Sequence, residues 1–180
     1  MKSATKDLEN DHVYILRLID IMERVTKTDA PDISDLESIV SLIKNYADGF
    51  HHAKEENILF PRLEEKGFSP HQGPVAVMLA EHIQGREYVK GMAENIKLCR
   101  EGNKSALKYV YANMSGYVTL LRNHISKENN ILFRMADNVL SPEDHARLLD
   151  EYARVEPVTP HGGGVTEYIS EIERLDNRYQ

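Results

Sequence analysis

Apolar residues recur every three or four positions along most of the chain, which is the spacing of helices with one buried face. Proline- and glycine-containing stretches divide this pattern into four long segments and two short ones. The long segments span residues 3–27, 34–65, 74–100 and 104–137, and the short ones span residues 141–155 and 165–178. Long helices joined by short loops favour an all-α chain, folded as an antiparallel up-down-up-down four-helix bundle. We expect residues 1–140 to form this bundle and residues 141–180 to add one or two C-terminal helices packed on the same domain.

Local signals mark where some of these helices begin. Ser34 and Glu37 have the spacing of a capping box, in which each side chain accepts the backbone N–H of the other residue. Ser141 precedes a proline and two acidic residues, which is the pattern of an N-cap, a first-turn proline and an acidic first turn. Pro61 lies inside the second long segment and predicts a kink there.

A ten-residue phrase occurs twice and carries most of the chemical information. It reads HHAKEENILF from His51 and HISKENNILF from His124. In each copy the His is followed four residues later by a glutamate, Glu55 in the first and Glu128 in the second. Residues four apart share one face of an α-helix. An imidazole and a carboxylate placed in this way can reach the same metal ion.

A lone histidine precedes each copy of the phrase. His12 lies 39 residues before His51, and His82 lies 42 residues before His124, each between an acidic and a β-branched residue. On a wheel of about 100° per residue the apolar positions cluster around these histidines, so all four point inward. Burying two glutamates without compensation would cost several kcal/mol each, and a metal ion supplies that compensation. The sequence therefore predicts a centre for two ions with six ligands: His12, His51, Glu55, His82, His124 and Glu128.

The first copy of the phrase offers a second pair at the same spacing, His52 and Glu56. The wheel places His51 about 53° from the centre of the apolar face of its helix and His52 about 153° from it. Aligning the two copies also selects His51 and Glu55. We therefore expect His52 and Glu56 to point outward. The remaining histidines lie in loops or near a helix start and are expected to be solvated: His71, His145 and His161.

Composition narrows the classes of protein that fit. The net charge of −7 and the pI near 5.6 argue against a nucleic-acid surface, which needs basic patches. No apolar run approaches the roughly 20 residues that span a bilayer, and the N-terminus lacks the apolar stretch of a secretory signal. The single cysteine, Cys99, excludes an internal disulfide and a thiolate cluster. We expect a cytoplasmic protein that binds neither nucleic acid nor membranes.

Imidazole and carboxylate ligands without a thiolate suit iron or manganese, and also zinc. With these residues in view, the chain resembles the hemerythrin-like HHE cation-binding domains. The resemblance covers about residues 5–140 and depends most on residues 8–12, 51–61, 81–82 and 124–128. It implies an antiparallel four-helix bundle around two iron ions per chain joined by an oxo or hydroxo bridge.

The family pattern also implies how the ligands are shared. His12 and His51 would bind one iron and His82 and His124 the other, while the carboxylates bridge the two: Glu55 and Glu128.

One position departs from the oxygen-carrying members of the family. Those proteins have a second His four residues after the His of the third helix, and this chain has Arg86 there. A guanidinium keeps its proton and cannot ligate a metal. One iron would therefore lose an imidazole and gain an open position, which argues against reversible O2 carriage. Arg86 would either extend its charged end into solvent or hold it near a bridging carboxylate.

Three classes of function remain open. The first is a non-haem di-iron protein that binds or senses O2, NO or iron, with self-association as a homodimer left open. The alternative is a di-iron peroxidase or oxidase acting on peroxide or O2, or a factor that repairs iron centres under nitrosative or oxidative stress. Repair members of the family add an N-terminal cysteine-bearing segment that this sequence lacks, which favours the first class. The third class is a metal-stabilised helical scaffold.

Overall fold

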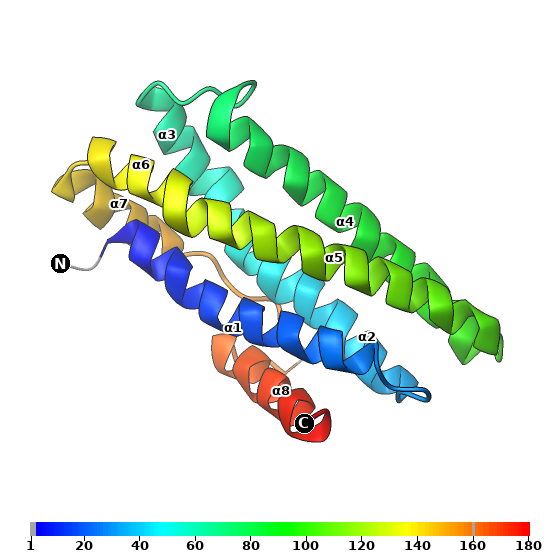
Figure 1. The fold of residues 1–180 in the computed structure, drawn as a ribbon. Helices are drawn as coiled ribbons and strands as arrows, with labels where there is room; N and C mark the ends of the chain where they lie inside the picture. Colours follow the sequence, from blue (N-terminus) through cyan, green and yellow to red (C-terminus); the bar gives the residue numbers. More distant parts are fainter. Residues whose placement is uncertain (1–2, 160) are drawn as a thin grey trace.

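Four long helical segments make up most of the computed structural model, which describes residues 3–159 and 161–180 (Figure 1). The first segment is α1 (Ala4–Val25), and the second runs through α2 (Ile33–Leu42), η1 (Ile43–His52), η2 (Glu55–Leu59) and α3 (Phe60–Glu65). The third is α4 (Gly73–Arg100), and the fourth runs through η3 (Lys104–Ala106), α5 (Leu107–Lys127), η4 (Glu128–Leu132) and α6 (Phe133–Val139). Two shorter helices follow, α7 (Pro142–Tyr152) and α8 (Val165–Arg178).

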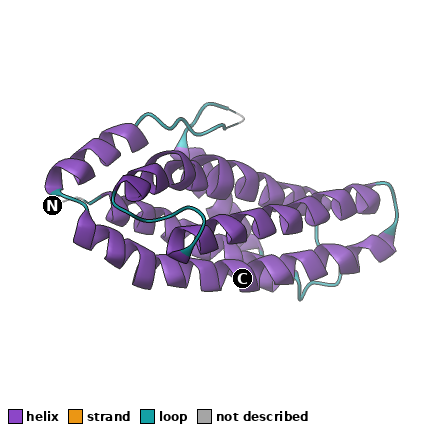
Figure 2. Ribbon diagram, turned by 90° about the horizontal axis from the view of Figure 1, so that it is seen from above, coloured by secondary structure: helices purple, strands orange, loops and turns teal. Residues whose placement is uncertain are grey.

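The prediction of an all-α chain is confirmed. Figure 2 shows only helices and loops, and no strand occurs among the described residues. In Figure 1 the chain reverses direction between successive long segments, so that each runs back beside the one before it. Within the described ranges, no helix is both long enough and apolar enough to cross a membrane.

The second and fourth long segments are not uniform α-helices. Both contain a π-helical stretch, with hydrogen bonds from residue i to i+5, at the same five positions of the repeated phrase: Glu55–Leu59 and Glu128–Leu132. A further π-helical stretch covers Ile43–His52. A π turn holds more residues than an α turn, so it rotates the following side chains away from the places given by an α-helical wheel. Pro61 is the second residue of α3, which begins directly after η2, and it lies in the first turn, where a proline is tolerated; the kink predicted there stays a prediction.

Of the helix starts predicted from capping patterns, the one at Ser141 is confirmed and the one at Ser34 is wrong. Ser141 Oγ accepts the N–H of Asp144, whose carboxylate accepts the N–H of Ser141, so α7 begins with a capping box. The capping box predicted at Ser34 is wrong, because Asp32 is the N-cap of α2 and accepts the Ser34 N–H at 2.9 Å. A carboxylate at a helix N-terminus also interacts with the helix dipole, which a serine hydroxyl does only weakly.

Buried apolar side chains form two clusters with a polar layer between them. The small cluster includes Leu8, Phe60 and Phe133. The large cluster contains the buried apolar side chains of α2, η1 and α5 and the remaining ones of α1 and α4. Along α1, His12 lies between Leu8 of the small cluster and Ile15 of the large one. The predicted ligands on the other long segments occupy the same place between the clusters.

The C-terminal helices pack on the long segments. Tyr152 of α7 belongs to the small cluster and Ile172 of α8 to the large one. Asp176 of α8 forms ion pairs with Arg17 and Arg24 of α1, the helix beside which α8 lies in Figure 1. The domain boundary at residue 140 stays a prediction.

Candidate metal centre

The structure brings all six predicted ligands together in the polar layer. None is more than 2% exposed, and they come from α1, η1, η2, α4, α5 and η4: His12, His51, Glu55, His82, His124 and Glu128. Together with His52, their ligand atoms fall into two groups, within each of which the atoms lie within 4.8 Å of one another; Asp48, His52 and Glu56 form a third such group at the edge of the layer. We name the two groups of four the first position (His12, His51, Glu55 and Glu128) and the second position (His52, Glu55, His82 and His124). Glu128 also contributes to the second position, because its other oxygen lies 3.2 Å from His124 Nε2.

Both carboxylates lie between the two positions. Glu55 places one oxygen 3.6 Å from His51 Nε2 and the other 3.5 Å from His82 Nε2. Glu128 places one oxygen 3.3 Å from His12 Nε2 and the other 3.2 Å from His124 Nε2. Each carboxylate therefore directs one oxygen toward each position, as a bridge between two ions would require.

In the first position the Nε2 atoms of His12 and His51 face each other. His51 Nδ1 donates to Asp11 at 3.2 Å, and His12 Nδ1 donates to the side-chain oxygen of Asn129 at 2.7 Å. With the proton on Nδ1, neutral imidazole has only a lone pair at Nε2. The two Nε2 atoms are 2.9 Å apart, which is close to the about 3 Å that separates neighbouring ligands on one metal ion at about 2.1 Å from each.

The second position repeats this arrangement. His82 Nδ1 donates to Glu56 at 2.7 Å and His124 Nδ1 donates to Glu81 at 3.0 Å. The Nε2 atoms of His82 and His124 are 3.1 Å apart. Lone pairs held this close repel unless a proton or a metal ion lies between them, so the donor set fits a metal ion at each position and a shared proton in its absence.

Four buried oxygens give independent support for bound cations. Both carboxylate oxygens of Glu55 and of Glu128 are buried and lack a hydrogen-bond partner among the described residues. A buried carboxylate without partners is strongly disfavoured, and metal coordination is one of the few arrangements that stabilise it. The residues present therefore fit a dinuclear metal centre.

Protons stabilise the centre in the absence of metal. Burial and the neighbouring Glu128 raise the pKa of Glu55 well above its usual value. Although burial acts in the opposite direction, Glu128 and Glu81 raise the pKa of His124 to about 9. Burial lowers the pKa of His51 to about 4, so this imidazole stays neutral at pH 7.

The outer contacts of the histidines follow the repeat in the sequence. Asp11 accepts from His51 and from Lys54, whose Nζ lies 2.8 Å away, and Glu81 accepts from His124 and pairs with Lys127. The two lysines occupy the same position in the two copies of the phrase, and the two acids directly precede the lone histidines. Aligning the copies would have identified these pairs, which the analysis of the sequence missed. Such contacts fix which ring nitrogen faces a metal.

The outward orientation predicted for His52 is wrong. The side chain is buried, its Nδ1 contacts Asp48 at 3.2 Å, and its ring stacks on that of His82 with 3.7 Å between centroids. Glu56 is half-buried and accepts from His82 Nδ1 at 2.7 Å. The α-helical wheel misplaced His52 because residues 43–52 are π-helical. The different number of residues per turn directs the side chain of His52 toward the centre, beside His51. The second position consequently has three imidazoles nearby, and His52 could supply the imidazole that Arg86 cannot.

Arg86 binds carboxylates that do not bridge. Its guanidinium donates to Asp48 at 2.6 Å and to Glu56 at 2.7 Å, and its side chain is 42% exposed. These two acids are the Nδ1 partners of His52 and His82. Arg86 therefore acts on the second position through the partners of its histidines.

Two side chains of α7 make contacts that were not predicted from the sequence. His145 is half-buried, and its Nδ1 accepts the N–H of Ala4 at the start of α1 at 3.3 Å, although solvation was predicted. Tyr152 is buried, its hydroxyl has no hydrogen-bond partner within the described part of the chain, and burial followed by the charge of Glu55 raises its pKa. No sequence motif indicates either contact, because both come from α7 packing against the long segments.

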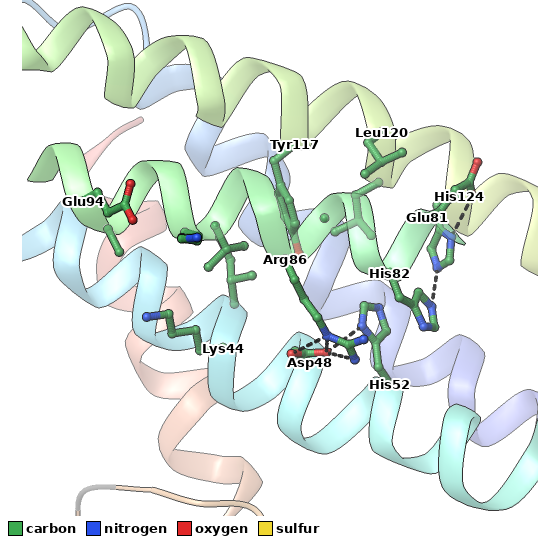
Figure 3. Close-up of a pocket in the computed structure, with 16 residues that line it drawn as sticks. Lys44, Asp48, His52, Glu81, His82, Arg86, Glu94, Tyr117, Leu120 and His124 are labelled. Carbon is green, nitrogen blue, oxygen red and sulfur yellow. Dashed lines mark hydrogen bonds and ion pairs between the residues drawn. The ribbon is translucent and has the colours of Figure 1, made fainter. Parts of the chain in front are cut away.

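A cavity of about 240 Å³ opens onto the second position (Figure 3). His52, His82 and His124 line its inner end, and no residue that belongs only to the first position lines it. Its walls come from η1, α4 and α5 and are mainly apolar: Ile43, Val89, Ala93, Tyr117, Leu120 and Leu121.

Comparisons with known proteins bear on this centre. The family described as Hemerythrin HHE cation binding domain matches residues 3–136. Two curated relatives, from Yersinia pseudotuberculosis serotype IB (strain PB1/+) and Yersinia pestis (strain Pestoides F), are both named Iron-sulfur cluster repair protein YtfE. They are 38% and 37% identical over 89 residues, which is 48% of this chain but only 40% of the length of each relative. No solved structure matches the chain.

The family match spans all four long helical segments, and the residues it covers include both metal positions. The resemblance seen in the sequence is therefore confirmed. The chain belongs to the hemerythrin HHE cation-binding domain family.

Proposed function

We propose that this chain binds two iron ions, one at each position, and acts in the repair of iron–sulfur clusters. The observation that carries the proposal is the buried layer in which the unpartnered oxygens of Glu55 and Glu128 meet two pairs of facing imidazole nitrogens. We also propose that the four long segments form an antiparallel bundle around this centre and that the protein acts in the cytoplasm.

The donor set favours iron or manganese over zinc. The second position offers five donor groups, namely His52, His82, His124 and one oxygen from each bridging glutamate. Zinc sites in proteins have four ligands in most cases, whereas iron and manganese accept six. Bound iron would supply a Lewis acid that also exchanges single electrons. The chain fixes the imidazole nitrogens, excludes water from the first position and neutralises the outer carboxylates with Lys54, Arg86 and Lys127.

The names of the relatives and the difference in access between the two positions support a role in repair. A cluster that has lost iron can be rebuilt only if iron is supplied, and iron at the second position would have a route out through the cavity. In this proposal the ion at the second position is cargo, and the ion at the first position stays in place.

An anaerobic reactivation assay tests this proposal. Aconitase whose [4Fe–4S] cluster has been damaged by peroxide is incubated, with dithiothreitol as the electron donor, with the iron-loaded protein, with the metal-free protein, or with the same amount of ferrous iron. We expect faster recovery of aconitase activity with the iron-loaded protein than with free iron, and no recovery with the iron-treated Glu55→Gln variant after desalting. Recovery no faster than with free iron would contradict a role in repair.

Binding of O2 or NO is the second candidate function. Five donors at the second position would leave an ion that accepts six ligands able to take a small molecule, and the apolar cavity opens onto this position. The test is the visible spectrum of the reduced protein before and after addition of O2 or NO. A new band that disappears on removal of the gas supports this function, and an unchanged spectrum rejects it.

A further inference from the structure

The cavity beside the second position is larger than a diatomic ligand requires. Its volume is about 240 Å³, whereas an apolar protein cavity of about 150 Å³ is enough to bind benzene. A pocket of this size with mainly apolar walls is suited to an organic molecule. The cavity also extends well beyond the centre, because its lining follows α4 from His82 to Glu94 (Figure 3).

The two ends of the cavity differ in charge. At the inner end one guanidinium, Arg86, pairs with two carboxylates, Asp48 and Glu56. At the outer end Lys44 and Lys90 form no ion pair with any described residue, and Glu94 is the single acid there. An anionic group is therefore favoured at the outer end and disfavoured beside Asp48.

The distance between the ends limits the length of the molecule. Lys90 follows His82 by eight residues on α4, which is about 12 Å by the rise of an α-helix. Between them the walls present Val89, Tyr117 and Leu121, which offer hydrocarbon contacts. A carboxylate on an unbranched chain of medium length matches this distance, this lining and this charge.

We propose that the cavity binds a medium-chain alkanoate, with its carboxylate at Lys44 and Lys90 and its hydrocarbon end at the second position. The bound chain covers the route to the second position and slows the exchange of its ion. The binding itself does not depend on the proposed repair function, because the lining residues belong to the chain whether or not iron is bound.

Calorimetric titration with decanoate tests the proposal, using the iron-loaded and the metal-free protein. We expect saturable binding of one decanoate per chain and at least tenfold weaker binding of uncharged 1-decanol. The double variant Lys44→Glu/Lys90→Glu should weaken decanoate binding at least tenfold, and Ala93→Phe, which fills the cavity, should abolish it. Lys108→Glu, an exposed change on α5 outside the cavity lining, is the matched control and should leave binding unchanged.

Three results would overturn the proposal. These are no saturable binding of decanoate, binding that survives both cavity variants, and 1-decanol binding as tight as that of decanoate. Failure of decanoate binding with normal iron content rejects the alkanoate site alone. Decanoate binding by a chain that takes up no iron rejects the metal centre alone.

Discussion

The first and second positions share both glutamates but differ in their surroundings. The first position has two imidazoles, and the cavity does not reach His12 or His51. The second position has three imidazoles, each of which lines the cavity. The repeat thus supplies equivalent ligands to the two positions, and residues that differ between the aligned copies make the positions unequal: His52 aligns with Ile125, and Glu56 with Asn129. We infer that the first position retains its ion and the second exchanges it.

The outer contacts show the same inequality. The histidines of the second position each contact a carboxylate, and those carboxylates pair with Arg86 or Lys127. At the first position His12 instead donates to the neutral amide of Asn129. A carboxylate partner raises the basicity of a metal-bound imidazole, whereas an amide does so less.

Removing a shared carboxylate should have the largest effect. We expect Glu55→Gln to lower iron content after anaerobic loading from two ions per chain to fewer than one, because both positions lose an oxygen ligand. The metal-free variant should unfold at the same temperature or higher, since a neutral amide replaces a carboxyl group whose raised pKa shows that burial disfavours its charged form. The exposed Glu87→Gln on α4 is the control. Iron content equal to that of the control would contradict a bridging role.

Removing one imidazole should separate the two positions. His51→Gln should leave one iron per chain, because the first position then has a single imidazole. His52→Gln should keep both ions but release one more readily, because the second position retains two imidazoles. Metal analysis after desalting measures both variants. An equal loss of iron in the two variants would contradict the difference between the first and second positions.

Iron affinity at the second position should fall as the pH is lowered. His124 has a pKa of about 9 in the metal-free protein, so it carries a proton at pH 7 that must leave when Nε2 binds a metal. One proton released corresponds to about a tenfold loss of affinity per pH unit, or about a hundredfold between pH 9 and pH 7. Calorimetry in buffers of different ionisation enthalpy measures the proton release. Binding without proton release at pH 7 would show that His124 is neutral.

Arg86 should affect only the second position. We expect Arg86→Gln to weaken iron binding there by about tenfold to a hundredfold, the usual range when an outer partner of a metal ligand is lost. Arg122→Gln is a matched control, since Arg122 is 40% exposed and also pairs with two carboxylates, Asp20 and Glu23. Competition with a chelator measures the affinities. Equal effects of the two variants would assign Arg86 a role in stability alone.

The smallest effect is expected from making the first position resemble the second. Asn129→Asp should strengthen iron binding at the first position by roughly threefold to tenfold, because His12 then donates to a carboxylate. Chelator competition with His52→Gln as the background resolves this position from the other. Unchanged affinity would mean that the partner of His12 does not contribute to the difference.

Two pairs of predicted ligands that the structure brings together depend on local spacing alone. His51 with Glu55 and His124 with Glu128 lie one turn apart, so small errors in helical register do not separate them. His52 was misplaced because the register of an α-helix was carried through a π-helical stretch that no residue pattern indicated. All four long segments and both C-terminal helices could be predicted from apolar spacing and helix caps.

Features made by packing could not be predicted. The cavity depends on how η1, α4 and α5 lie against one another, and Tyr152 reaches the neighbourhood of Glu55 only through the docking of α7. The partners of Arg86 also come from a different segment, 30 and 38 residues away in sequence. Lys54 and Lys127 are the exception, because the repeat and the acid before each lone histidine are visible in the sequence.

Removal of iron by a chelator tests the central claim most directly. The protein is loaded anaerobically with ferrous iron and mixed with an excess of a chelator that gives a coloured complex, and the release is followed over time. We predict release of two ions per chain in two phases of equal amplitude, a fast phase from the second position and a slow one from the first, with His52→Gln accelerating only the fast phase. Release in a single phase, or of fewer than two ions per chain, would contradict the claim that the six buried ligands form two unequal metal positions.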